Sequence, residues 1–249
     1  MAPFASRGAK ETVISHNLWN PSMLKRYLRR FNPRSWSNDE LRLVLSHCQK
    51  KSRVVNVSGW QDRDKEGGCY KDYFPSPTLY HISNYEGDAA RGAVAETDLV
   101  IDLTKPLSIA HEYQYDIVFN HTVLEHVEEP TFAFSQIGKL TTDMIVTVVP
   151  FKQKLHFEHG MFGDYYRFTP FSMRRLHAEN GFSVLYESYT PRPSLDVYLL
   201  YVGVRDVARH VDFPQRLADL RALNQRVGSF SAKDLALNIG ARFFGKYLM

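Results

Sequence analysis

The segment YDIVFNHTVLEHVEEP (Tyr115–Pro130) is the part of the sequence that best indicates the fold. It begins with a run that centres on Ile117–Phe119, and such apolar, β-branched and aromatic residues are typical of a buried strand. The residues after this run favour a helix, which Pro130 interrupts because proline cannot donate the backbone hydrogen bond of a helix interior. A buried strand that passes directly into a helix is the repeating unit of sheets with helices packed on their faces.

The same alternation continues on both sides of this segment. Strand-like runs occur at residues 53–59, 78–85, 98–103, 143–151, 183–189 and 197–204. The stretch 169–182 is predicted to be a helix, since Pro170 suits a first helical turn and Gly181 a helix end. The turn PRPS (191–194) would allow the last strand to return antiparallel. We therefore predict an α/β fold: a Rossmann-like, seven-stranded, mostly parallel sheet with helices on both faces and the last strand antiparallel.

Helical stretches flank this sheet. One is predicted at Asn20–Phe31, and another begins at the start signal Ser37–Glu40. We expect three parts, an N-terminal helical arm at 1–50, the sheet domain at 51–204 and a C-terminal helical extension at 205–249. One face of the last helix carries Leu235, Ile239, Phe243 and Tyr247. Two interpretations of this helix stay open: it packs on the domain or on a second subunit, as in a homodimer, or it rests on the inner face of a membrane as a basic amphipathic helix.

The composition excludes several classes of protein. The chain has 249 residues, of which 44% are hydrophobic, and this suits one globular domain with a sizeable core. Cys48 and Cys69 are too few for a disulfide framework or a cysteine zinc site, so we expect a reducing, cytoplasmic compartment. The N-terminus lacks the apolar run of a signal peptide, and no stretch reaches the roughly 18 apolar residues that span a bilayer. A net charge of +4 without a dense Lys/Arg tract argues against a nucleic-acid partner.

Three segments resemble motifs of the class I S-adenosylmethionine-dependent methyltransferases. They are DLVIDLTKPL (98–107), the opening segment 115–130, and FEHGMFGDYYRFTPFSMRRLHAENGF (157–182), which is similar to a region of many small-molecule and glycan methyltransferases. Their order along the chain matches the family, and the resemblance covers residues 50–204. It implies the cofactor S-adenosyl-L-methionine and methyl transfer to a hydroxyl of a sugar, a glycan or a small molecule such as a phenol, as in polysaccharide biosynthesis.

The expected cofactor loop, VVNVSGWQDRDKEGG (Val54–Gly68), departs from the family pattern. The family has an acidic residue in the first strand and then a Gly-x-Gly-x-Gly turn, where glycine allows a positive φ and a close approach of the backbone to the ligand. Here Asn56 takes the acidic position. Ser58 and Trp60 replace the first two glycines, and Asp62 lies near the third. Three interpretations stay open: a divergent but working cofactor site, a different ligand in the same crevice, and a non-catalytic methyltransferase-like binding protein.

In open α/β sheets, ligands bind outside the carboxyl ends of the strands. On that basis and on the resemblance, the expected cofactor contacts are Asn56, Ser58, Gly59, Trp60, Asn84, Asp102, Leu103, Asn120 and His121. Asn84 would bind the ribose hydroxyls and Asp102 the adenine amino group, although Asp102 could instead cap the turn after its strand. Asp62 and Asp64 could receive the ammonium group of the cofactor. His121 could face the substrate, whereas His126 is expected to be structural.

The loop after the fifth strand holds the densest cluster of titratable side chains, namely His156, Glu158, His159 and Asp164. A histidine titrates near neutral pH and can take the proton from an attacking hydroxyl. We predict His159 as this general base, with His156 as the second choice and Asp164 orienting the ring. The substrate wall is predicted to consist of Tyr165, Tyr166 and Arg167. A metal site, a solvated loop without chemistry, and a bracing ion pair of Arg167 are the alternatives, and we predict no metal because no helical histidine pair is present.

Overall fold

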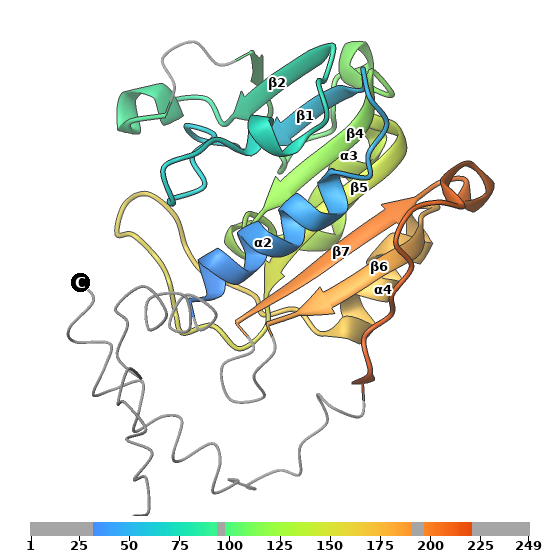
Figure 1. Ribbon diagram of the computed structural model, residues 1–249. Helices are drawn as coiled ribbons and strands as arrows, with labels where there is room; N and C mark the ends of the chain where they lie inside the picture. Colours follow the sequence, from blue (N-terminus) through green and yellow to red (C-terminus); the bar gives the residue numbers. More distant parts are fainter. Residues whose placement is uncertain (1–31, 94–97, 191–196, 221–249) are drawn as a thin grey trace, which may run out of the picture.

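The structure is a computed structural model that describes residues 32–93, 98–190 and 197–220. Its centre is a seven-stranded sheet in the order β3-β2-β1-β4-β5-β7-β6 (Figure 1). The strands are β1 (Arg53–Val57), β2 (Leu79–Asn84), β3 (Leu99–Val100), β4 (Tyr115–His121), β5 (Thr141–Pro150), β6 (Ser183–Tyr189) and β7 (Tyr198–Val204). The first five strands pair in parallel, and β7 runs antiparallel between β5 and β6. The predicted sheet, mostly parallel with an antiparallel last strand, is confirmed.

Among the described residues, three α-helices cover the two faces of this sheet: α2 (Pro33–Leu45), α3 (Pro130–Lys139) and α4 (Pro170–Glu179). Figure 1 shows α2 in front of the sheet and α3 and α4 behind it. Each begins with a proline, whose fixed φ suits the first turn and whose missing N–H is not needed there. The start predicted for α2 at Ser37–Glu40 is wrong. The helix begins at Pro33, because the Asn32 side chain caps it by accepting a hydrogen bond from the Arg34 amide (2.9 Å).

The connections between β1, β2, β3 and β4 differ from those later in the chain. Their described residues contain only short 3-10 turns, at Tyr70–Tyr73, Asp88–Arg91 and Ile109–His111, where helical segments were expected. In the first connection, residues 66–69 are rich in glycine and Phe74–Pro77 contains two prolines, and both stretches interrupt helical periodicity. Loops with short 3-10 turns, rather than α-helices, therefore connect β1, β2, β3 and β4 in the described residues.

Both faces of the sheet are packed. On one face, α2 buries Trp36 and Leu41 in a cluster that includes Val202 of β7. On the other face, Phe134 of α3 and Met173 of α4 are fully buried. Removal of such apolar side chains from water is the main force that holds helices on a sheet. Part of the predicted N-terminal arm is thus packed on the sheet, while the division into arm, domain and extension otherwise stays a prediction.

The predicted C-terminal helix, within residues 221–249, lies outside the described residues. Its packing on a second subunit or on a membrane therefore stays a prediction. In the described part of the chain, no helix is both long and apolar enough to cross a membrane. The same residues contain no group of three or more His, Cys, Asp or Glu side chains that could hold a metal ion.

Candidate functional site

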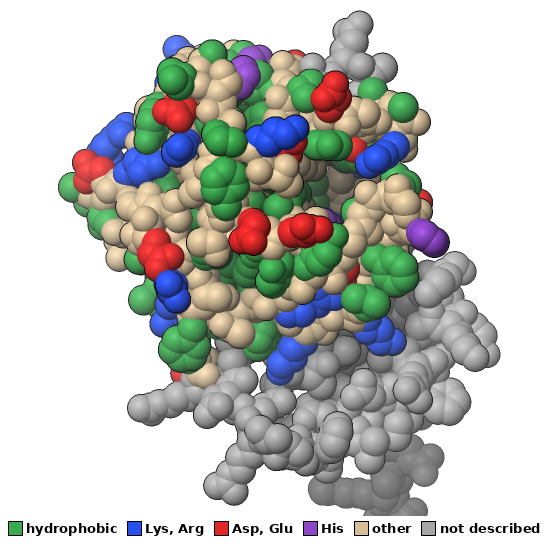
Figure 2. Space-filling view, turned by 180° about the vertical axis from the view of Figure 1, so that it is seen from behind, with side chains coloured by type: hydrophobic (Ala, Val, Ile, Leu, Met, Phe, Trp, Pro, Cys, Tyr) green, Lys and Arg blue, Asp and Glu red, His purple; other side chains and the backbone are tan. Residues whose placement is uncertain are grey.

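A large pocket lies at the carboxyl ends of the parallel strands. Its volume is ≈ 1230 Å³, and it is lined by residues that follow β1, β2, β3, β4 and β5, together with Arg34 of α2. The loops after β1 and β4 meet here, because these strands are neighbours with Val57 opposite Asn120. A hollow with charged side chains of both signs around it is visible on the surface (Figure 2). Since small-molecule pockets usually measure about 300–1,000 Å³, this one has room for a cofactor and part of a second molecule.

Most of the predicted cofactor residues line this pocket, namely Asn56, Ser58, Gly59, Trp60, Asp102, Leu103 and His121. Asn84 and Asn120 are buried and do not line it. The Asn120 Nδ2 donates a hydrogen bond to the Val57 carbonyl (3.3 Å), so this side chain ties β4 to β1. A contact of either asparagine with a cofactor stays a prediction.

The loop after β1 has the backbone shape of a glycine-rich turn without most of its glycines. Ser58, Trp60 and Asp62 have φ angles of 53°, 54° and 57°. These are the residues that the sequence places at or near the three glycine positions of the family. A left-handed conformation costs a non-glycine residue roughly 1–2 kcal/mol, and such strain is concentrated at functional sites. At Gly59, between them, an added Cβ would lie 2.7 Å from the Asn56 Nδ2, so this glycine has no room for a side chain.

Asp62 is buried within this loop and does not line the pocket. Its carboxylate accepts hydrogen bonds from the Asn56 Nδ2 (2.7 Å), the Tyr80 hydroxyl (2.6 Å) and the Lys71 amide (3.0 Å). Burial raises the pKa of Asp62 above its ordinary value, and the three hydrogen bonds act against this rise. The carboxylate therefore holds the loop together.

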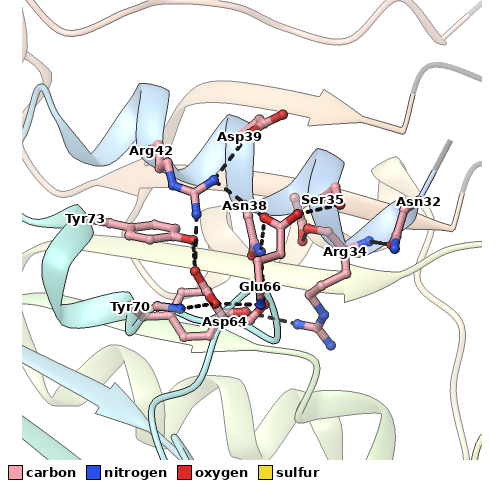
Figure 3. Close-up of polar contacts among 12 residues, drawn as sticks. Asn32, Arg34, Ser35, Asn38, Asp39, Arg42, Asp64, Glu66, Tyr70 and Tyr73 are labelled. Atoms are coloured by element: carbon pink, nitrogen blue, oxygen red, sulfur yellow. Dashed lines mark hydrogen bonds and ion pairs between the residues drawn. The ribbon is translucent and has the colours of Figure 1, made fainter. Parts of the chain in front are cut away.

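Asp64 joins the same loop to α2. It accepts hydrogen bonds from the Tyr73 hydroxyl (2.7 Å) and from the amides of Glu66 (2.7 Å) and Gly68 (2.9 Å), and it pairs with the Arg42 Nη2 at 3.2 Å (Figure 3). Burial alone would raise the pKa of Asp64, but these bonds and the Arg42 charge outweigh it, so its pKa lies below the ordinary value. Both acidic residues are thus engaged within the loop, and a contact of either with a ligand's ammonium group stays a prediction.

Asn84 also holds the loop, from the end of β2. Its Oδ1 accepts a hydrogen bond from the Trp60 amide (2.8 Å), and its Nδ2 donates to the Trp60 carbonyl (3.2 Å). The pocket is lined at this end by Tyr85 and Asp88, which were not predicted. The signal for Asp88 was present in the sequence, since the family carries an acidic residue after its second strand and Asp88 is a carboxylate shortly after β2.

Asp102 lines the pocket and also caps the turn after β3. Its Oδ1 accepts hydrogen bonds from the amide (3.0 Å) and hydroxyl (2.6 Å) of Thr104, and its Oδ2 pairs with the Lys105 Nζ at 2.8 Å. Burial acts to raise the pKa of Asp102, but the bonds to Lys105 and Thr104 lower it overall, so the group is an ionised acceptor at neutral pH. The turn-capping alternative is thus observed, and the contact with adenine stays a prediction.

His121 ends β4 and lies in the pocket beside Arg34. The Arg34 Nη1 is 2.9 Å and 3.0 Å from the two ring nitrogens of His121, and it donates to the Tyr70 hydroxyl (3.1 Å). Burial and, after it, the positive charge of Arg34 hold the pKa of His121 well below its ordinary value. His121 is therefore neutral at pH 7. Nothing in the sequence pointed to Arg34, because it lies on a helix outside the strand-and-loop pattern that locates ligand sites.

The loop between β5 and α4 brings only part of the predicted catalytic cluster to the pocket. His156, Glu158 and Tyr165 line it. His159 is exposed and lies at an open hollow formed by residues 157–163, which shares Glu158 and Phe162 with the large pocket. The role of either histidine as a base stays a prediction, but only His156 of the two borders the large pocket.

Asp164 and Arg167 brace this loop. The Asp164 carboxylate binds the Arg167 guanidinium through both oxygens and accepts a hydrogen bond from the His156 amide (2.6 Å). Arg167 also donates to the carbonyls of Gln153 and Lys154, each at 2.9 Å. The hydrogen bond from Arg167 lowers the pKa of Asp164. The bracing alternative for Arg167 is thus observed, and neither residue lines the pocket.

The two tyrosines of the predicted substrate wall differ. Tyr165 lines the pocket, with its hydroxyl 3.4 Å from the Glu128 Oε1. Tyr166 donates a hydrogen bond to the Glu128 carbonyl (2.7 Å) and does not line the pocket. Tyr165 is therefore the one whose ring borders the space for a ligand.

His126, which was expected to be structural, lines the pocket with a defined orientation. Its Nδ1 is 2.6 Å from the Gly163 carbonyl, so Nδ1 carries the proton and donates it. The Nε2 is then an acceptor, 3.8 Å from the Glu125 Oε1. Burial lowers the pKa of His126, and burial raises that of Glu125 to about 8. At neutral pH, the His126 ring is therefore unprotonated at Nε2 and Glu125 is mostly protonated.

The comparisons with known proteins concern the fold. No protein-family model and no curated protein matches the chain. A chain of the complex between the Haloferax volcanii Trm112 methyltransferase activator and a methyltransferase is 14% identical, with a TM-score of 0.51 over 80% of this chain and 97% of that one. A methyltransferase from Mesorhizobium loti is 13% identical (TM-score 0.49, 71% and 100% covered), and magnesium protoporphyrin IX methyltransferase from Synechocystis is 17% identical (0.46, 75% and 96%). The first likeness and the sheet order together show that the chain has the fold of the class I S-adenosylmethionine-dependent methyltransferases.

Proposed function

We propose that the protein is an S-adenosylmethionine-dependent methyltransferase that methylates a hydroxyl of a sugar, a glycan or another small molecule. The observation that carries this proposal is the loop after β1, which holds Ser58, Trp60 and Asp62 in the left-handed conformation at the edge of the large pocket. Strain at three residues of one loop is explained by a backbone shape that a ligand requires.

The residues of the pocket fit this cofactor. Ile101 and Leu103 supply apolar surface for an adenine ring, and the ionised Asp102 can accept a hydrogen bond from its amino group. Asp88, four residues after the end of β2, lines the pocket and is the residue that we assign to the ribose hydroxyls. S-adenosylmethionine carries no phosphate, so the loop after β1 need not form a phosphate-binding nest. When bound, the cofactor supplies an electrophilic methyl group on its sulfonium.

The chain would contribute positioning of the acceptor hydroxyl and removal of its proton. Among the histidines of the pocket, His126 is the best base, because its Nδ1 proton is held by the Gly163 carbonyl and its Nε2 is free to accept. His121 is less suited, since both of its ring nitrogens lie within 3.0 Å of Arg34. His156 is the second choice. A base role for His159 would require the loop to move, because this side chain lies outside the large pocket.

Calorimetry with S-adenosylmethionine and S-adenosylhomocysteine tests the proposal. Both should bind, and Asp102→Ala should weaken the affinity for S-adenosylhomocysteine about tenfold through the loss of one charge-assisted hydrogen bond. Asp116→Ala is the matched control. It removes a carboxylate that pairs with Arg53 (3.0 Å) at the opposite end of the strands, and it should leave the affinity unchanged. Absence of binding by both ligands contradicts the proposal.

A second candidate is a non-catalytic methyltransferase-like binding protein. The amides of Gly59 and Trp60 favour this candidate. They donate hydrogen bonds to Ser83 and Asn84, so they are not free for a ligand. Under this alternative, neither cofactor form binds, so the same calorimetric experiment separates the two candidates.

A further inference from the structure

The cationic side chains that line the pocket fall into two groups. Arg91 has a carboxylate partner, Asp88, at 3.7 Å. Arg34, Arg63 and Lys65 also line the pocket, and among the described residues no carboxylate lies within ion-pair distance of them. Like charges that share a cleft repel one another and raise the local concentration of anions. These three cations therefore have no ion-pair partner among the described residues, although the carboxylates of Glu128 and Glu158 also line the pocket, on the loops after β4 and β5.

Arg34 is held through only one of its three guanidinium nitrogens. Its Nη1 contacts the Tyr70 hydroxyl and the His121 ring, and its Nε and Nη2 make no hydrogen bond with any other described residue. Figure 3 shows the side chain directed away from α2 toward Tyr70. A guanidinium edge with two free N–H groups matches two oxygens of a phosphate or a carboxylate. The orientation of Arg34 is thus fixed while its binding edge remains open.

Lys65 is kept close to Arg34 by the contacts between the loop and α2. The residues that follow them in sequence are bonded to each other, since the Ser35 hydroxyl donates to the Glu66 Oε1 (2.7 Å) and the Asn38 Nδ2 donates to the Glu66 Oε2 (3.0 Å) (Figure 3). Lys65 itself has a φ of 61°, a further left-handed residue of this loop. Partial desolvation of the ammonium group and then the charge of Arg34 lower the pKa of the otherwise exposed Lys65, which agrees with the closeness of the two segments.

The charges of the methyl donor point to the other substrate as the partner of these cations. S-adenosylmethionine has a sulfonium and an ammonium group but a single carboxylate, so positive charge exceeds negative charge. A cluster of cations repels such a molecule as a whole and attracts an anion. The acidic side chains Asp88 and Asp102 lie after β2 and β3, where the proposed function places the adenosine. The carboxylates Asp88 and Asp102 are thus assigned to the donor, which leaves Arg34 and Lys65 for a second molecule.

We propose that Arg34 and Lys65 form a binding site for an anionic group, a phosphate or a carboxylate, of the methyl acceptor. The inference rests on the proposed function and narrows its acceptor to an anionic hydroxyl compound, such as a sugar phosphate or a sugar acid. Arg63 adds to the positive field at the same side of the pocket.

Titration of inorganic phosphate into the protein saturated with S-adenosylhomocysteine tests this site, because the donor site is then filled. We expect phosphate to bind the wild-type complex and both Arg34→Gln and Lys65→Gln to weaken it about tenfold, the effect of losing one hydrogen bond to a charged group. Arg91→Gln is the matched control, since it removes a pocket cation that already has a carboxylate partner. It should change the phosphate affinity less than about twofold. Lys65 is an exposed loop residue, so its variant remains informative even if Arg34→Gln does not fold.

Three results would overturn the proposal. The first is that phosphate binds neither the complex nor the free wild-type protein. The second is that phosphate binds the free protein but not the complex, which would show that the cations serve the donor's carboxylate. The third is that all three variants weaken phosphate binding equally. Failure of S-adenosylhomocysteine to bind is observed before phosphate is added. It contradicts the proposed function, and with it the assignment of the anion to an acceptor, so the two failures are distinguishable.

Discussion

Two loops border the pocket, and they contrast in how their charged residues are used. The loop after β1, residues 58–68, contains few residues that suggest catalysis, yet its carboxylates bond to β2, to α2 and to the turn at Tyr70–Tyr73. The loop after β5, residues 151–168, is dense in titratable groups, yet its main ion pair joins Asp164 to Arg167 within the same loop. The number of titratable side chains in a segment is therefore a poor guide to which of them reach a ligand.

The difference lies in the range of the contacts. Asp64 and Arg42 are far apart in the sequence, so their contact fixes one element of the fold against another. Asp164 and Arg167 are three residues apart, so their contact shapes only the local chain. Changes in the first loop should therefore affect the whole molecule, and most changes in the second should stay local.

The largest expected effect is on the rate of methyl transfer. It tests whether the general base lies in the loop after β5 or outside it. His126→Gln should lower the rate of methyl transfer by about 10²–10⁴-fold, the usual contribution of a general base, because the bond of Nδ1 to the Gly163 carbonyl leaves Nε2 as the acceptor nitrogen of a ring that lines the pocket. His159→Gln is the matched control and should leave the rate within about twofold. The measurement is transfer from labelled S-adenosylmethionine to a panel of hydroxyl acceptors. The opposite order, with His159 essential, would show that the exposed loop closes over the pocket during catalysis.

The next effect concerns stability. Asp64→Asn should lower the free energy of unfolding by about 2 kcal/mol, since the buried carboxylate loses a charge-assisted hydrogen bond from Tyr73 and its ion pair with the half-exposed Arg42 of α2. Asp164→Asn should lower it by only about 1 kcal/mol, because Arg167 keeps its carbonyl partners. Urea denaturation of both variants gives the comparison. Equal losses would show that the second loop supports the whole fold as much as the first.

The pH dependence of stability reports on the ionisation of Glu125. This residue contacts the second loop, because its backbone carbonyl accepts a hydrogen bond from the Tyr165 amide (2.8 Å). Its folded-state pKa is raised from 4.5 to about 8, so the folded protein binds this proton more tightly than the unfolded chain. Its contribution is therefore fully present below pH 4.5 and is lost as the pH rises toward 8. The wild-type protein should lose about 1 kcal/mol per pH unit across this window relative to Glu125→Gln. Parallel stability profiles of the two proteins would contradict this.

The smallest effect concerns backbone strain. Ser58→Gly should raise the free energy of unfolding by roughly 0.5 kcal/mol, since the relief of a left-handed residue slightly exceeds the entropy that glycine loses on folding. In the second loop, Gly160 has a φ of 75° with nothing within 4 Å of an added Cβ, so Gly160→Ala should lower stability by about 1 kcal/mol. Thermal denaturation of both variants measures these changes. A loss of stability in Ser58→Gly would show that the serine side chain, rather than the backbone shape, matters at this position.

The sequence predicted the sheet well because strands leave a local signal. The bounds of β6 were predicted to the residue, since it is a compact run between polar or glycine-containing stretches. The start of α2 was predicted wrongly, because Ser37–Glu40 resembles a helix start and masked the simpler signal of Asn32 followed by Pro33.

The site was less predictable because its geometry depends on residues that are far apart in the sequence. The resemblance located Asp102 and His121, which line the pocket. It could not show that Asn84 would be engaged by the Trp60 backbone, nor that Arg34 would reach His121 from a helix that precedes the sheet. His126 was not predicted as a base, because the titratable cluster at 156–164 gave the stronger sequence signal. The proposed role of His126 depends on its hydrogen bond to the Gly163 carbonyl.

The packing of α2 has a consequence for how the chain reaches its final form. This helix precedes β1, yet it packs on β7, and its Glu40 accepts a hydrogen bond from the Tyr186 hydroxyl (2.6 Å), a residue 146 positions later. Contacts of such long sequence separation form slowly, because the intervening chain must first be ordered. As the chain is synthesised, α2 can first contact only β1, β4 and the loop after β1, and its contacts with Tyr186 and Val202 form after β6 and β7 have emerged. Nascent chains that stop short of β7 therefore hold α2, and with it Arg34 of the pocket, by fewer contacts than the finished chain does.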